Sequence, residues 1–288
     1  MIRIRFWGTR GSVPTPGPST VRYGGNTACV ELRGPGGEIV IFDAGTGARE
    51  CGNKLLQESD GKPLEIHLLL SHLHWDHILG LPFFRPAYNS RNVIAIYGPS
   101  QHAHHGPEDE AFGHLSLRHL LGISMNDPFF PVDLDGLPAR LVVKELDGSP
   151  FTIGSLHFRT AHTYHPAPCL AYRVDDGGRA VVYATDTEDP YTSRENPVIA
   201  LAQEADLLIH DAQYVVEDLK PGWGHSTVDA AVDVALRAHV GHLVLFHHDP
   251  DRSDEALDHI GEEARRLADA KGSRMPVTVA REGLELTV

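Results

Sequence analysis

Three histidines and one aspartate stand within six positions in the stretch Ser71-His72-Leu73-His74-Trp75-Asp76-His77. This stretch follows an apolar run that is typical of a strand buried on both faces. Side chains two apart point the same way in an extended chain, so His72, His74 and Asp76 can converge where the strand ends. His77 breaks that period and suits a chain that turns into a helix. Four polar groups gathered at one strand end constrain this chain more than any other feature.

Imidazole and carboxylate groups bind zinc, and they also bind manganese or iron. Four such groups exceed what one ion normally takes from one short loop, so the stretch predicts two adjacent divalent ions. Zinc is the first expectation, with manganese and iron as the alternatives. A solvated, His-rich turn is the competing interpretation, since short ligand motifs also occur by chance.

The composition fits a soluble globular protein that can bury a core. The chain has 288 residues, of which 41% are hydrophobic and 22% charged. Its formal net charge of -14 speaks against a surface built for non-specific nucleic-acid binding, which is usually basic. The three cysteines never form a C-x-x-C pair, and no apolar run is long enough to span a membrane. We therefore expect a cytoplasmic protein without a disulfide framework.

Ligand-type residues also stand at the ends of other predicted strands. No linker or composition shift divides the chain, so one layered domain, residues 1–288, is the simplest account. The predicted strands are 2–7, 27–32, 38–42, 64–71, 93–97, 140–145, 151–153, 155–160, 169–174, 180–184, 205–209, 242–246, 277–279 and 284–286. The strand-end residues are Asp43, His165, Asp186, His210, Asp211, His247 and His248. For Asp43, capping a turn and supporting the metal site from outside are equally good interpretations.

Two helices are predicted in the second half of the chain. Residues 226–229 have the form of a capping box, and an apolar stripe at helical spacing follows them. His225 thus comes just before a helix N-terminus, a place that favours anions such as phosphate. A second amphipathic helix is expected over 253–270.

The segment 99–135 is predicted to be an irregular insertion with a helical piece over 115–121. Such a segment could form a lid, a dimer contact or a wall over the site. Its histidines match no ligand spacing, and they are interpreted as solvated loop residues. They are His102, His104, His105, His114 and His119.

The set of strand-end ligands, together with Phe42-Asp43-Ala44-Gly45, resembles the metallo-beta-lactamase fold. This resemblance covers nearly the whole chain and implies an α/β protein, an αββα four-layer sandwich with a two-metal site along one edge of its sheets. Tyr183-Ala-Thr-Asp186-Thr and Gly224-His225-Ser226-Thr227 are similar to the phosphodiesterase branch of that family. The branch includes the tRNA 3′-processing nuclease ribonuclease Z, the phosphoribosyl cyclic phosphate phosphodiesterases, and relatives that act on cyclic nucleotides.

The resemblance implies a role for each matching residue. One ion would be held by His72, His74 and His165, the other by Asp76, His77 and His247, and Asp186 would bridge them. His247 is preferred over His248 because the branch has a His at the strand end with Pro three residues later, and Pro250 satisfies that pattern. His248 is then a structural residue.

The resemblance also implies a mechanism. Two ions roughly 3.5 to 4 Å apart can share a water, lower its pKa and direct the hydroxide in line at phosphorus. Asp76 belongs to this catalytic set as a ligand, and His225 would act as general acid. Asp211, at a position where relatives often carry Glu, would orient His225. His210 is interpreted as a buried, hydrogen-bonded residue, and Arg10 as a solvated loop arginine.

The substrate is expected to be a small phosphodiester such as a cyclic nucleotide or a cyclic sugar phosphate. The tRNA-processing enzymes of the branch usually carry a long arm between the third ligand motif and the bridging Asp. Here only 186 minus 165, or 21, positions separate the two, and a hairpin fills them. The cysteine cluster of some phosphoribosyl cyclic phosphodiesterases is missing as well.

Two alternative functions remain open. The alternatives are a ribonuclease Z-like nuclease acting on tRNA or other RNA, and a non-catalytic metal or ligand sensor. The resemblance further implies a homodimer.

Overall fold

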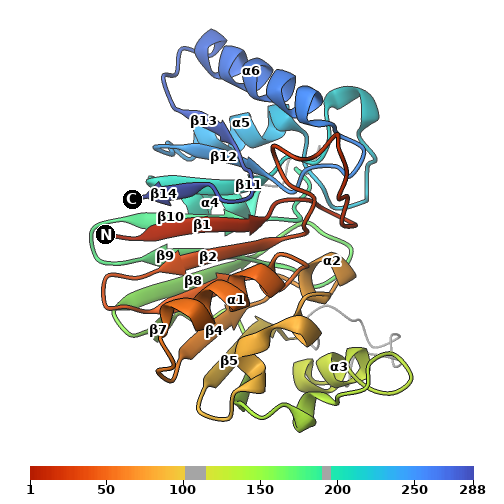
Figure 1. Cartoon of the computed structure of the whole chain (residues 1–288). Coiled ribbons are helices and arrows are strands. Elements are labelled where there is room, and N and C mark those ends of the chain that lie inside the picture. Colours follow the sequence, from red (N-terminus) through yellow and green to blue (C-terminus); the bar gives the residue numbers. More distant parts are fainter. Residues whose placement is uncertain (101–114, 190–195) are drawn as a thin grey trace.

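Two seven-stranded sheets packed face to face form the centre of the computed structural model (Figure 1). The structure describes residues 1–100, 115–189 and 196–288. The first sheet has the order β14 (Glu285–Thr287), β1 (Arg3–Gly8), β2 (Cys29–Arg33), β3 (Ile39–Phe42), β4 (Glu65–Leu69), β5 (Val93–Pro99) and β6 (Arg140–Leu146). The second has the order β13 (Val277–Val279), β12 (Leu243–Phe246), β11 (Leu207–Asp211), β10 (Ala180–Ala184), β9 (Leu170–Asp175), β8 (Leu156–His162) and β7 (Phe151–Ile153).

Helices cover the outer face of each sheet. The first sheet carries α1 (Ala48–Glu58), the short α2 (Trp75–Ile78) and α3 (Leu117–Ser124). The second carries α4 (Pro197–Ala202), α5 (Val228–Arg237) and α6 (Asp254–Ala270). The predicted αββα sandwich is thereby confirmed.

Three apolar cores separate these four layers. The central core joins residues of both sheets, with Phe6 and Phe42 from the first and Tyr183 and Phe246 from the second. Two outer cores lie between each sheet and its helices. Because β3, β4, β10 and β11 are covered on both faces, their side chains are almost all buried, as the apolar runs in the sequence predict.

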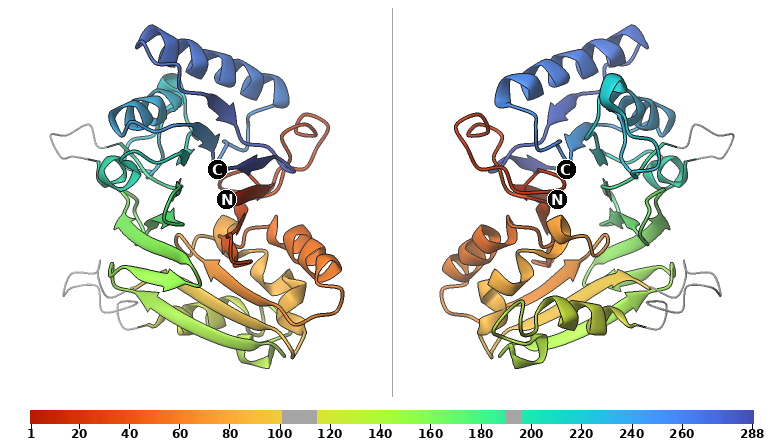
Figure 2. Two further views of the ribbon diagram at one scale, coloured as in Figure 1. Left: turned by 90° about the vertical axis from the view of Figure 1, so that its left-hand side faces the viewer. Right: turned by 90° about the vertical axis from the view of Figure 1, so that its right-hand side faces the viewer.

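Parallel pairing within each sheet brings strand ends to a common edge. β3, β4, β5 and β6 are parallel neighbours in the first sheet, and β10, β11, β12 and β13 in the second. The chain termini are also close together, because β1 pairs with β14 (Figure 2). Among the described residues, no helix has the length and apolar character needed to cross a bilayer.

The two helices predicted in the second half, now α5 and α6, match their expected positions, whereas the short α4 was not predicted. Thr227 caps α5 by accepting a hydrogen bond from Ala230 N, and Ser253 caps α6 by accepting one from Ala256 N. The predicted tight hairpin between β9 and β10 is present, with antiparallel pairing from Ala180 and Asp175 onward.

The first half differs from the prediction in three places. Helix α1 was not predicted, because its buried stripe consists mainly of small residues and Gly47 at its N-cap provides no side-chain hydrogen bond. Helix α2 begins at Trp75, earlier than expected, so Asp76 lies in a helical turn rather than in an extended segment. The helix in the insertion is α3, a few residues later than predicted, and His119 on it is exposed, as expected. The other four histidines of that segment, from 102 to 114, lie outside the described residues.

Candidate metal centre

The predicted ligands come together where strands of both sheets end. The loops after β4, β8, β10 and β12 bring seven side chains into two groups, each with ligand atoms within 4.8 Å of one another. Site A consists of His72, His74, His165 and Asp186. Site B consists of Asp76, His77, Asp186 and His247. The division into two groups agrees with the roles that the resemblance implies.

Site B has the spacing that a small metal ion requires. The Nε2 atoms of His77 and His247 face each other at 3.3 Å, and Asp76 Oδ2 lies 3.1 Å from each of them. Ligand atoms of a tetrahedral ion with bonds of about 2.0–2.1 Å stand about 3.3–3.4 Å apart. Two imidazole nitrogens and two carboxylates at this spacing therefore fit a divalent cation.

The ligand atoms of site A also fit a divalent cation. His72 Nε2 is buried and has no hydrogen-bond partner within the described parts of the chain. His165 Nε2 lies 3.2 Å from His74 Nδ1, so these two nitrogens also face each other. An unpartnered buried nitrogen is costly in an apolar interior, and a metal ion would satisfy it.

Asp186 joins the two sites. Its Oδ2 lies 3.2 Å from His77 Nε2 and 3.3 Å from His247 Nε2, in site B. Its Oδ1 lies 3.7 Å from His72 Nε2, in site A. One oxygen facing each group is the arrangement of a bridging carboxylate.

Hydrogen bonds on the outer side fix the orientation of four histidines. In each case Nδ1 meets an oxygen, which leaves Nε2 directed at the metal centre. The pairs are His72 with Ser71 Oγ at 3.0 Å, His77 with Asp43 Oδ2 at 2.8 Å, His165 with Gly224 O at 3.1 Å, and His247 with Gln213 Oε1 at 3.0 Å. His74 differs, because its Nδ1 faces the site.

Asp43 supports the site from outside, so one of its two predicted roles is present. Its carboxylate is fully buried and accepts hydrogen bonds from Ser71 N, Ser71 Oγ and Tyr183 Oη, in addition to the contact with His77. These partners fix both carboxylate oxygens.

The pKa values of the ligand side chains indicate that protons and metal ions compete for the same atoms. Burial opposes the charged form of His77, but Asp76, Asp186 and Asp43 raise its pKa well above the ordinary value. Burial likewise opposes ionisation of Asp76, yet His77 and His247 hold its pKa far below the usual range. Burial lowers the pKa of His165 to about 4. Divalent ions would take the place of the proton on His77, so metal affinity should rise with pH.

Four non-glycine residues at the site have left-handed backbone conformations. They are Ser12, Asp43, Asp186 and His247, with φ between 50° and 64°. Such φ values are uncommon outside glycine and gather at functional sites. Each lies where the chain turns at a strand or loop end, and of the four only Asp186 and His247 supply ligand atoms.

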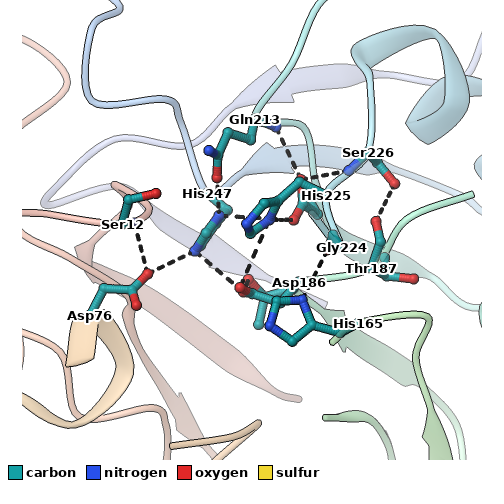
Figure 3. A network of polar contacts seen from close by, with 12 residues as sticks. Ser12, Asp76, His165, Asp186, Thr187, Gln213, Gly224, His225, Ser226 and His247 are labelled. Atoms are coloured by element: carbon teal, nitrogen blue, oxygen red, sulfur yellow. Dashed lines mark hydrogen bonds and ion pairs between the residues drawn. The ribbon is translucent and has the colours of Figure 1, made fainter. Parts of the chain in front are cut away.

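His225 lies beside the metal centre (Figure 3), where it forms a pair with Asp211. Asp211 Oδ2 lies 2.8 Å from His225 Nδ1, and its other oxygen accepts hydrogen bonds from Gln213 N and Ser226 N. Burial lowers the pKa of His225, but the charge of Asp211, aided by Asp186, outweighs it and raises the pKa to about 9. The short Asp211 side chain therefore reaches His225 directly.

Three residues of the centre carry no signal in the sequence. Ser12 N donates to Asp76 Oδ2 at 2.8 Å, and Gln213 orients His247 from the other side (Figure 3). Gly11 lies so close to His247 that a Cβ added there would stand 2.4 Å from its ring. For Gly11 and Ser12, the only signal in the sequence is that the loop after β1 is rich in glycine and proline.

The interpretation of Arg10 as a solvated residue is wrong. Arg10 is fully buried, and its guanidinium donates to the carbonyl oxygens of Gly24, Asp249 and Arg252. Burial lowers its pKa. It therefore ties the loop after β1 to the segment that follows His247.

The two remaining strand-end histidines, His210 and His248, are buried and hydrogen-bonded, as expected. His248 is buried with Nε2 2.8 Å from Ala280 O, and it belongs to neither site. His210 is buried with Nδ1 2.7 Å from Asp211 O.

Comparison with known proteins assigns the chain to a protein family. Residues 39–248 match the family described as the beta-lactamase superfamily domain. The chain belongs to this family. A ribonuclease Z from Natronomonas pharaonis is 29% identical over 301 residues, which cover 85% of this chain and 86% of that protein.

Two solved structures share the fold over almost their whole length. The metallo-beta-lactamase fold protein YhfI from Bacillus subtilis superposes with a TM-score of 0.69 at 20% identity, covering 99% of this superfamily member and 98% of YhfI. A diphosphatase from the PhnP family superposes with a TM-score of 0.66 at 18% identity, covering 100% and 98% of the two chains. At these identities the likeness concerns the fold.

Proposed function

We propose that this protein is a metal-dependent phosphodiesterase with two divalent ions. The observation that carries the proposal is the pairing of sites A and B through Asp186, with the His225–Asp211 pair at 2.8 Å beside them. When bound, two such ions lower the pKa of a water molecule and neutralise the charge of a phosphate group. Zinc is the first choice for both ions, and manganese or iron would suit the same ligands.

The protein residues have three tasks in this proposal. His72, His74 and His165 hold one ion, Asp76, His77 and His247 hold the other, and Asp186 contacts both. Asp43 and Gln213 keep the rings of His77 and His247 in place, so that the ligands are arranged before metal binds. This preorganisation limits the reorganisation needed during the reaction.

His225 donates the proton to the leaving oxygen in this scheme. With a pKa raised to about 9, its imidazole is charged at neutral pH and can also stabilise negative charge on the phosphate. Asp211 keeps Nδ1 engaged, which fixes the plane of the ring. The position just ahead of helix α5 favours an anionic substrate as well.

A small phosphodiester, such as a cyclic nucleotide or a cyclic sugar phosphate, is the substrate that the chain favours. The turn between β9 and β10 contains only residues 176–179, so no arm extends from it to hold a tRNA. The net charge of -14 also disfavours a large polyanion.

A ribonuclease Z-like nuclease is the second candidate. It is favoured by the 29% identity to a protein named ribonuclease Z, over most of both chains. Cleavage of precursor tRNA with a steep dependence on salt would support this candidate over the first, because phosphate contacts release counterions.

A substrate panel on protein of known metal content tests both candidates. The panel contains bis(p-nitrophenyl) phosphate, cyclic nucleotides, cyclic sugar phosphates and a precursor tRNA. Hydrolysis of at least one phosphodiester by the wild type, with a large loss in His225→Ala, is expected. Metal-loaded protein that cleaves none of them would overturn the proposal.

A further inference from the structure

A pocket opens directly beside site A. It has a volume of about 450 Å³, and more of its lining is apolar than polar. Its lining residues are Thr163, Tyr164, His165, Pro166, Glu188, Gly222 and Gly224. They come from the connection between β8 and β9, from the segment after β10, and from the turn before His225.

His165 connects this pocket to the chemistry. It is one of the lining residues, and its Nε2 lies 3.2 Å from His74 Nδ1 in site A. Gly224, which also lines the pocket and whose carbonyl oxygen lies 3.1 Å from His165 Nδ1, immediately precedes His225. A group in the pocket is therefore next to a phosphate held at the metal centre, close enough to belong to the same small substrate.

Hydrogen bonds fix the pocket walls relative to one another. The Glu188 carboxylate accepts from Gly222 N at 2.8 Å and from Gly224 N at 3.1 Å, and Glu188 N donates to Tyr164 O at 2.9 Å. Gly224 has a φ of +82°, and a Cβ there would stand 2.2 Å from His165 Nδ1. The close approach of residue 224 to the His165 ring thus requires glycine. The hydrogen bonds of Glu188 and this approach together fix the shape of the pocket.

The lining indicates which group it takes. Tyr164 contributes an aromatic residue to the lining, and Pro166 and the two glycines contribute uncharged surface. Preformed pockets of this kind bind apolar or aromatic groups, with a few polar contacts that fix their orientation. Glu188 is the acidic residue among the lining residues, so an additional phosphate on the substrate would be repelled there.

We propose that this pocket binds the nucleobase of the substrate, which makes the enzyme a nucleotide phosphodiesterase rather than a sugar phosphate phosphodiesterase. The proposal rests on the proposed function, since it names the substrate class of the same site. A base stacked on an aromatic side chain contributes about 1–3 kcal/mol by alanine substitution, which corresponds to a factor of about 5 to 150 in affinity.

Matched substrates and two variants of Tyr164 test this proposal. The cyclic or linear nucleotide that is hydrolysed fastest is compared with its analogue in which a methyl group replaces the base. We expect the wild type to prefer the nucleotide by about tenfold or more in kcat/KM. Tyr164→Ala should reduce that preference about tenfold, mainly through KM, whereas Tyr164→Phe, which keeps the ring, should retain it.

Binding of adenosine to the metal-free protein, measured by calorimetry, separates this proposal from the proposed function. If no phosphodiester is cleaved but adenosine binds and Tyr164→Ala abolishes binding, the proposed function fails and the base pocket stands. If phosphodiesters are cleaved equally well with and without a base, and adenosine does not bind, the base pocket is overturned and the proposed function stands.

Discussion

Replacing Asp43 by Asn should weaken metal binding at site B without unfolding the protein. The Asp43 carboxylate accepts four hydrogen bonds, of 2.7 Å from Ser71 N, 2.9 Å from Ser71 Oγ, 2.7 Å from Tyr183 Oη and 2.8 Å in the contact with His77 Nδ1. An amide has one oxygen in place of two, so at least one of these donors loses its acceptor. An unsatisfied buried donor costs about 1–3 kcal/mol of folding free energy.

The effect on metal binding follows from the contact with His77. In either orientation of the amide, the contact with His77 Nδ1 loses the negative charge of its acceptor. Changing an outer partner of a ligand in this way typically lowers metal affinity about 10- to 100-fold, or about 1.4–2.8 kcal/mol. Competition with a chromophoric chelator, followed over two binding steps, measures this directly. One step should weaken by this factor and the other, belonging to site A, should change much less.

Tyr183→Phe is the matched control for this experiment. It removes one hydroxyl donor to Asp43 but keeps both the carboxylate and the ring that stacks on Phe42 at 4.9 Å. We expect site B in this variant to keep its affinity within about threefold, well short of the loss from removing an outer ligand contact. A folded Asp43→Asn protein with unchanged affinity in both steps would refute the idea that Asp43 orients His77.

Three further substitutions have defined outcomes. Gly11→Ala would place a Cβ 2.4 Å from the His247 ring, and because ordinary contact begins near 3.4 Å, the ring must move away by about 1 Å. Site B should then lose its ion, so that metal content falls to about one ion per chain. A variant that retains two ions would contradict this. Although burial lowers the pKa of His225, Asp211 raises it, so kcat/KM of the metal-loaded protein should fall as pH rises through this pKa. Asp211→Asn should move that alkaline limb to lower pH, and an unmoved limb would exclude His225 as the acid. Arg10→Met removes the donor to three carbonyl oxygens and should lower the free energy of unfolding by about 2–4 kcal/mol in denaturant titrations, whereas Arg91→Met at the exposed surface should change it by less than about 0.5 kcal/mol.

The parts of the fold with strong local patterns could be predicted from the sequence. Buried strands appear as apolar runs, and the ligands follow them directly, so the chain order alone indicated that His72, Asp186 and His247 lie at strand ends. The reason given for Asp76 was incomplete, however. It reaches the centre from the first turn of α2 and joins His77 and His247, whereas an extended chain would have placed it with His72.

The residues that sequence reasoning missed act through contacts between distant segments. Arg10 was expected in solvent because its loop is rich in glycine and proline, but two of its acceptors, Asp249 and Arg252, lie 239 and 242 positions away. Gln213 and Ser12 are common polar residues without any characteristic spacing, and their roles depend on where His247 and Asp76 lie. Only the folded chain defines such partners.

The central claim is that two metal ions, held by sites A and B, make this protein a phosphodiesterase. The most direct test measures metal content and hydrolysis of bis(p-nitrophenyl) phosphate on the same samples during titration of metal-free protein. We predict two ions bound per chain, with hydrolysis rising as both sites fill and lost in Asp186→Ala. Protein that binds two ions and hydrolyses none of the phosphodiesters in the panel, or that hydrolyses them equally well without metal, would contradict the account.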